Sequence, residues 1–209
     1  LLSKDSDEPS SQSVRGQLLF TPSDELNLLL TGEYYHDEVD GLSNKLTPGE
    51  GDPAVFVGFL ANFAHTADPD FFESTNRQFG GMDRDIYGLS ARIEWTTDIG
   101  VVTYIPAYRK TEFVLERDLG GITFSNVNTP QQRGFESSVK KAEDYETTSH
   151  EIRLASSPDD DGPLSWVTGF YYLDEETARE QERYRVVNTY LSNTLDILKA
   201  NTNSWGVFA

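Results

Sequence analysis

One stretch of the sequence, residues 87–96, limits the folds open to this chain more than any other feature. Apolar residues occupy every second position of it, and polar residues or glycine occupy the others. Because successive side chains of a β-strand point to opposite faces, this pattern predicts a strand with one apolar and one polar face. A soluble protein buries such an apolar face in a core, whereas an outer-membrane barrel turns it toward lipid. The apolar residues are Tyr87, Leu89, Ala91, Ile93 and Trp95.

Three turn sequences organise the predicted strands into hairpins. They are "TPSDEL" at 21–26, "TTDIGV" at 96–101 and "SSPDDDGPL" at 156–164. Each combines Asp with Pro or Gly and lies between β-rich segments, as hairpin turns do. These turns predict six strands in three hairpins, and "SWGVFA" at the end of the chain predicts the start of a seventh strand.

The connections between the predicted hairpins are long, at roughly residues 37–84, 117–146 and 175–203. Short turns that alternate with long polar loops collect at opposite ends of a sheet. That asymmetry is typical of a transmembrane β-barrel, which has short periplasmic turns and long extracellular loops. Within these loops, residues 53–65 and 189–200 have apolar residues at helical spacing, which predicts short loop helices on the rim.

Aromatic residues recur at both ends of the predicted strands. Trp95 and Trp166 lie beside turns, and tyrosines follow about nine residues beyond each turn. Nine residues at about 3.3 Å each, tilted by about 45°, cover roughly 20–25 Å, which is close to the apolar band of an outer-membrane barrel. The spacing therefore predicts two aromatic girdles at the level of the headgroups. The tyrosines are Tyr34, Tyr35, Tyr108, Tyr171 and Tyr172.

The alternative fold is a soluble β-sandwich that binds a ligand, for instance a carbohydrate, on its long loops. Leu19 and Leu29 fall on the faces that should be polar, as a strand covered on both sides would allow. Pro106 cannot donate a hydrogen bond within a ladder, which predicts a bulge or a local kink in its strand.

The composition excludes several classes of protein. The chain has 17 Lys and Arg against 35 Asp and Glu, and its net charge of −18 argues against binding nucleic acid through the phosphates. It has no cysteine, so it can hold neither a disulfide nor a thiolate metal site. No apolar run reaches the roughly 18 residues of a transmembrane helix. The sequence starts without Met and stops within a predicted strand, so we expect a fragment of a longer protein.

Three segments that carry the predicted hairpins resemble the barrel region of TonB-dependent outer-membrane receptors, in the branch abundant in sphingomonads and related proteobacteria. They are "VRGQLLFTPSDELNLLLTGEYY", "YGLSARIEWTTDIGVVTYIPAYRKTE" and "HEIRLASSPDDDGPLSWVTGFYYLDEE". The departures are Pro106, where the family usually has Thr, and the unmatched loop at 39–83. The matching residues are Tyr108, Arg109, residues 151–156, Trp166, Gly169, Tyr171 and Tyr172.

The resemblance implies an all-β, antiparallel up-and-down transmembrane barrel of about 22 strands, of which residues 1–209 form a partial domain. It places the chain in the outer membrane of a Gram-negative bacterium, with a plug domain and remaining strands outside this segment. The implied function is TonB-coupled uptake of a scarce cargo, with an iron–siderophore complex as the leading class and cobalamin or plant glycans behind it. The implied partners are TonB and outer-membrane lipid. The residues expected to face lipid are Tyr87, Leu89, Ala91, Ile93, Trp95, Ile152 and Leu154.

Aromatic residues of the first long loop are the candidate ligand contacts. An exposed apolar group in a loop can form a lid over a ligand, although packing of these rings within the loop is the favoured interpretation. The candidates are Phe56, Phe59, Phe63, Phe71 and Phe72, followed by Phe79.

No pattern of catalytic residues points to an enzyme, and no cofactor is expected. The serines lie outside a nucleophile-elbow context, and no glycine-rich phosphate loop occurs. His65 with Asp68 and Asp70 offers cation ligands, but their spacing matches no established loop and favours a solvated acidic loop. His36 and His150 are interpreted as polar-face or rim residues without partners, so no metal ligand is assigned.

Overall fold

The computed structural model describes residues 8–42, 80–118, 136–157, 164–187 and 190–209. All the regular structure in these ranges is β, which confirms the predicted all-β class. The strands are β1 (Glu8–Ser23), β2 (Leu26–Leu42), β3 (Gly80–Thr97), β4 (Gly100–Asp118), β5 (Glu136–Ala155), β6 (Val167–Val187) and β7 (Tyr190–Phe208).

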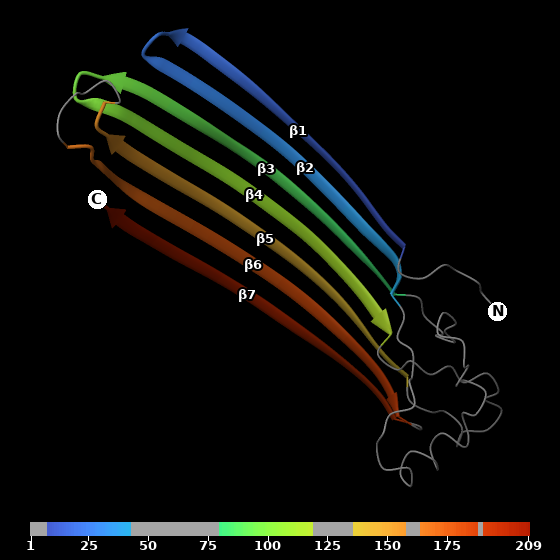
Figure 1. Cartoon of the computed structure of the whole chain (residues 1–209). Helices are drawn as coiled ribbons and strands as arrows, with labels where there is room; N and C mark the ends of the chain where they lie inside the picture. Colours follow the sequence, from blue (N-terminus) through green and yellow to red (C-terminus); the bar gives the residue numbers. More distant parts are fainter. Residues whose placement is uncertain (1–7, 43–79, 119–135, 158–163, 188–189) are drawn as a thin grey trace, which may run out of the picture.

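The strands form one seven-stranded sheet in the order of the chain, β1-β2-β3-β4-β5-β6-β7 (Figure 1). Every neighbouring pair is antiparallel, which confirms the up-and-down topology. Within the described ranges β1 and β7 each pair on one side only. These strands therefore form a single layer, in contrast to the two packed sheets of the alternative sandwich.

The first two predicted turns join β1 to β2 and β3 to β4 at one end of the sheet, where β7 also ends (Figure 1). The third predicted turn lies mostly outside the described residues, but the strand ends that flank it, Ala155 of β5 and Val167 of β6, are paired with each other. The second turn depends on Gly100, which has a φ of 142°. A Cβ at Gly100 would lie 2.1 Å from the carbonyl oxygen of Ala155 on the neighbouring strand. Only glycine combines this backbone conformation with so close an approach. We call this end of the sheet the turn end and the opposite end the far end.

The strands are longer than the sequence analysis predicted. β5 already begins at Glu136, and β6 continues to Val187, so much of the expected loops at 117–146 and 175–203 is strand. Only residues 188–189 separate β6 from β7. The alternation of short turns with long connections therefore stops at the third hairpin.

The helix predicted at residues 189–200 is wrong, because residues 190–200 belong to β7. Its leucines have helical spacing, but this segment pairs with β6 along its whole length, from Tyr190 with Val187 through to Phe208 with Gly169. A short isolated helix offers no comparable gain, since its stability depends on packing of its apolar face. The other predicted helix, at 53–65, lies outside the described residues.

Pro106 interrupts the β3–β4 ladder without shifting it. The pairing stops after Ser90 with Ala107 and resumes at Ile93 with Tyr104 in the same register. The expected bulge is therefore absent, and a local gap in the pairing replaces it, as the missing N–H of proline explains. On its other side Pro106 stays paired with His150 of β5.

Candidate functional site

The pairing register determines which residues share a face of the sheet, because residues directly opposite each other in an antiparallel pair project to the same side. We call the two sides the Leu89 face and the Arg92 face, after two residues of β3. Near the turn end the Leu89 face is almost wholly apolar. This apolar band consists of Val14, Leu18, Phe20, Leu26, Leu28, Leu30, Leu89, Ala91, Ile93, Trp95, Val102, Tyr104, Ile152, Leu154, Phe170 and Val207.

Many side chains of the apolar band are exposed to a degree that is unusual for large apolar residues, and the others are half-buried. Leu18 is 63% exposed, Leu89 62% and Val207 71%. No large side chain of the described residues is fully buried, so this sheet has no core of its own. A continuous apolar surface across seven strands exceeds the patches that soluble monomers normally leave uncovered. All seven residues expected to face lipid lie on this face.

A row of tyrosines ends the apolar band on its far side. We define the tyrosine row as Tyr34, Tyr87, Tyr108 and Tyr172. The rings of Tyr34 and Tyr87 lie 5.2 Å apart between centroids. Their neighbours beyond the row are polar: the Tyr34 hydroxyl donates a hydrogen bond of 2.6 Å to Asp85, and the Tyr172 hydroxyl donates one of 2.8 Å to Asn203. The rings of Tyr34 and Tyr172 thus lie at the apolar border with their hydroxyls on polar partners.

The tyrosine row crosses the strands obliquely. Tyr87 lies opposite Tyr34, but Tyr108 lies opposite Leu89, two residues nearer the turn end. Tyr172 lies opposite His150, and His150 lies opposite Pro106, which is two residues nearer the turn end than Tyr108. The row thus shifts toward the turn end from one strand to the next. If the row marks a level boundary, the strands are tilted relative to that boundary, as strands in a barrel are.

The predicted girdle of tyrosines is corrected in one respect. Tyr35 and Tyr171 follow the same turns as the members of the row, but their parity places them on the Arg92 face. Tyr35 lies there with the guanidinium of Arg84 5.7 Å from its ring centroid. Leu19 and Leu29, the exceptions to the alternation, lie opposite each other on this same face.

Beyond the tyrosine row the Leu89 face becomes acidic. Its described basic residues are lysines, of which Lys110 lies 2.7 Å from Glu112 and Lys140 lies 2.7 Å from Glu116. Hydrogen bonds to these glutamates raise the pKa of each lysine. The carboxylates of this far region are Glu38, Asp40, Asp83, Asp85, Glu112, Glu116, Asp144, Glu146, Asp174, Glu176, Glu180 and Glu182.

The Arg92 face is polar along most of its length and holds every arginine of the described strands. Arg84 makes a two-point contact with Asp37, with N–O distances of 2.8 and 2.9 Å. Arg92 pairs with Glu94, and Arg153 with Glu151, each two residues along its own strand. The arginines are Arg15, Arg84, Arg92, Arg109, Arg117, Arg153, Arg179, Arg183 and Arg185. The arginines of the described strands thus share one face, where several of them pair with carboxylates of that same face.

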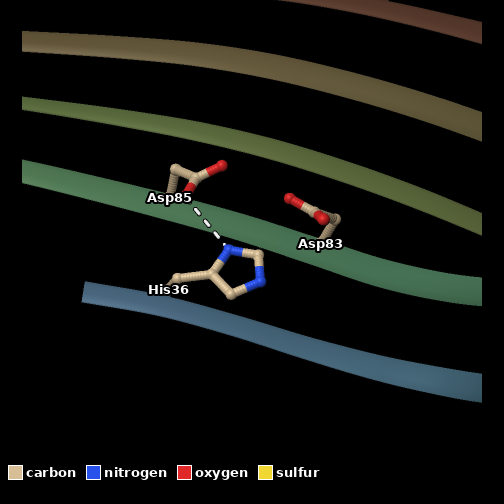
Figure 2. Close-up of side chains that lie close together, drawn as sticks. All are labelled: His36, Asp83 and Asp85. Atoms are coloured by element: carbon tan, nitrogen blue, oxygen red, sulfur yellow. Dashed lines mark hydrogen bonds and ion pairs between the residues drawn. The ribbon is translucent and has the colours of Figure 1, made fainter. Parts of the chain in front are cut away.

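One cluster on the Leu89 face has the composition of a metal site (Figure 2). The Nδ1 atom of His36 on β2 lies 3.0 Å from Oδ1 of Asp85 on β3, and Asp83 lies two residues further along β3. One ligand atom from each side chain lies within 4.8 Å of the others. The hydroxyl of Tyr34, and then His36, lower the pKa of Asp85 against the opposing effect of burial.

The sequence analysis left His36 without a partner, and the structure corrects this. The register between β2 and β3 brings His36 opposite Asp85, although the two residues are 49 positions apart in the sequence. No local spacing contains that information. The Asp-x-Asp pattern at 83–85 was the one sequence signal for a metal site here, but this pattern is also common on solvated strands that bind no metal.

The remaining candidate residues lie outside the described ranges. They are Phe56, Phe59, Phe63, Phe71, Phe72 and Phe79, together with His65, Asp68 and Asp70. In the part of the chain that the structure describes, no helix has the length and apolar character needed to cross a membrane.

Comparisons of this chain with protein-family models, with curated proteins and with solved structures found no match. The resemblance of its hairpins to TonB-dependent receptors therefore stays a prediction.

Proposed function

We propose that this chain forms part of the wall of a transmembrane β-barrel in a Gram-negative outer membrane. In this proposal the Leu89 face contacts lipid and the Arg92 face lines the lumen. The observation that carries the proposal is the exposed apolar band bounded by the tyrosine row. Tyrosine is suited to that boundary, since its ring is apolar and its hydroxyl can remain hydrated.

The height of the apolar band matches a membrane. On β3 it extends from Trp95 to Tyr87, eight residue steps apart. At about 3.3 Å per step the band is roughly 26 Å long along the strand, and a tilt of about 35–45° reduces this to about 19–22 Å. The apolar belt of an outer-membrane barrel is about 25 Å tall. Beyond the row the Leu89 face carries many carboxylates, as a segment in water would, although Val114, Leu195 and Ile197 are exposed apolar residues there.

The open sheet sets a further condition. Inside lipid every backbone N–H and C=O must be paired, and the outer edges of β1 and β7 have no partner within the described residues. The proposal therefore requires further strands to close the barrel. A TonB-dependent receptor of about 22 strands supplies them, and the present chain is then one section of its wall.

The transport function of this proposal rests on the resemblance of the three hairpin segments to TonB-dependent receptors. The receptor binds a scarce cargo, with a ferric siderophore as the leading class, on its extracellular side. TonB, driven by the proton-motive force, opens the path through a plug domain outside this segment. The lumen wall contributed by this chain is the Arg92 face.

Two adjacent leucines give a matched test of the lipid-facing assignment. Leu18 and Leu19 are both 63% exposed but lie on the Leu89 face and the Arg92 face respectively. Leu18→Arg in the complete protein should abolish assembly, because arginine near the membrane midplane costs about 2–4 kcal/mol. Leu19→Arg should assemble nearly as the wild type, because its side chain meets water.

The readout is the amount of heat-modifiable, folded protein recovered in outer-membrane fractions. Equal recovery of both variants in the membrane would overturn the assignment of the Leu89 face to lipid. Equal loss of both, with a soluble wild-type protein, would favour the sandwich module instead.

The transport part of the proposal has a separate test. Cells lacking the complete gene should lose energy-dependent uptake of radiolabelled iron supplied as a siderophore, and cells lacking TonB should show the same loss. Unchanged iron uptake with lost uptake of cobalamin would reassign the cargo. Unchanged uptake of every tested cargo would overturn the transport function and leave the barrel assignment intact.

A further inference from the structure

We infer that His36, Asp83 and Asp85 form a binding site for one divalent transition-metal ion, of which Zn²⁺ is the representative. The site lies on the Leu89 face, directly beyond the tyrosine row. It is independent of the proposed transport function, because it is argued from these three side chains and their surroundings alone.

The first argument is convergence of ligand atoms from two strands. Figure 2 shows the imidazole of His36 on β2 directed toward the carboxylates of Asp85 and Asp83 on β3. The closest pair of ligand atoms is 3.0 Å apart, and all three lie within 4.8 Å of one another. Bonds of about 2.0–2.2 Å to a shared ion place neighbouring ligands about 3.0–4.4 Å apart. A small rotation of Asp83 therefore completes the arrangement.

The second argument is the chemistry of the ligand set. An imidazole nitrogen suits Zn²⁺, Cu²⁺, Fe²⁺ and Ni²⁺, whereas Mg²⁺ and Ca²⁺ prefer all-oxygen sites. Two carboxylates and one histidine leave at least one position open for water or another ligand. The hydroxyl of Tyr34 donates a 2.6 Å hydrogen bond to Asp85, and such outer contacts orient metal-binding side chains.

The third argument is the shortage of other positive charge. Glu38 lies opposite Asp83, and Glu112 lies opposite Asp85, both on the same face. The nearby Lys110 is held by Glu112 at 2.7 Å, and the arginines of the described strands lie on the other face. Within the described residues the Asp83 carboxylate makes no hydrogen bond or ion pair. A bound cation supplies the charge that this surface lacks.

The test uses the complete protein, purified in detergent, stripped with EDTA and titrated with Zn²⁺ by calorimetry. We expect one equivalent of Zn²⁺ to bind to the wild type, and Asp83→Asn to weaken the affinity at least tenfold. The matched control is Glu180→Gln, which also removes one carboxylate from the far region of the Leu89 face but should leave the affinity unchanged. Folding of each variant is checked by heat-modifiable migration.

A second measurement addresses the nitrogen ligand. Co²⁺ bound to the wild type should give visible absorption bands that shift or disappear in His36→Gln. An equal loss of affinity in Asp83→Asn and Glu180→Gln would overturn the site and indicate a diffuse acidic surface. Absence of Zn²⁺ binding by the folded wild type would overturn it as well. Neither result would change the expected membrane assembly.

Discussion

The turn-end and far-end halves of the Leu89 face are formed by the same strands but have opposite chemistry. From Trp95 to Tyr87 the face of β3 is apolar, whereas from Asp85 onward it is acidic. The Arg92 face shows no such break, because ion pairs such as Arg92–Glu94 and Arg84–Asp37 occur in both halves. A protein core would require apolar residues wherever a second layer covers the sheet. On β3 the band stops at Tyr87, which agrees with the proposed lipid slab, whereas on β7 the exposed Leu195 and Ile197 continue the apolar character beyond the row.

The largest expected effect distinguishes the two halves of the Leu89 face. Ile93→Arg places a charge within the apolar band and should cost about 2–4 kcal/mol, enough to prevent assembly. Val114→Arg places the same charge on the same face in the far half, opposite Asp83, and should leave assembly near the wild-type level. The measurement is denaturant unfolding of the complete protein refolded into lipid vesicles. Equal destabilisation by both substitutions would contradict the membrane boundary at the tyrosine row.

A smaller effect is expected at the boundary itself. Tyr87→Ala removes a ring that contacts Tyr34, and we expect about 1–1.5 kcal/mol of destabilisation in vesicles. Tyr184→Ala is the control, because Tyr184 lies on the same face in the far half and is similarly exposed, at 37% against 41%. Its loss should change the free energy of unfolding little. A cost at Tyr184 as large as that at Tyr87 would argue against an interfacial role for the row.

On the Arg92 face we expect an effect of about 1 kcal/mol from the Arg84–Asp37 contact. Arg84→Lys keeps the charge but loses the two-point geometry, so it should retain only part of this stability. Unfolding of the two variants Arg84→Lys and Arg84→Gln in vesicles would measure the difference. If both variants were as stable as the wild type, the pair would add nothing to the stability of the Arg92 face.

The smallest effect is expected at the exposed pair of Lys140 and Glu116. Both side chains are more than half exposed, so Lys140→Gln should cost less than about 0.5 kcal/mol and the cost should shrink in high salt. Glu116 raises the pKa of Lys140 in the folded protein. The stability contributed by this ion pair is therefore fully present below the usual lysine pKa of about 10.4, and it is lost as pH rises through the higher pKa of the folded state. The measurement is the free energy of unfolding of wild type and Lys140→Gln across this alkaline range. The difference between them should shrink as pH rises, and a growing difference would contradict the prediction.

Much of the fold could be predicted because its signals are local. The turns before Leu26 and around Gly100 combine residues with defined turn conformations, and the alternation from Tyr87 to Trp95 reports the faces of β3 directly. The far halves of β5 and β6 were missed, since they are rich in polar and charged residues and lack an apolar alternation. The far half of β7 was instead predicted as a helix, because its leucines have helical spacing. Their strand conformation comes from pairing with neighbours, for example of Glu182 with Lys140 and Leu195.

The sequence by itself determined the β class, the hairpin order and the apolar face of β3, because turn chemistry and a period of two act over a few residues. Only the tertiary structure decided that the tyrosines of separate strands form one oblique row, that the arginines of the described strands share one face, and that His36 meets Asp85. Each of these depends on the register between strands, which long-range backbone pairing determines and which no short stretch of sequence encodes.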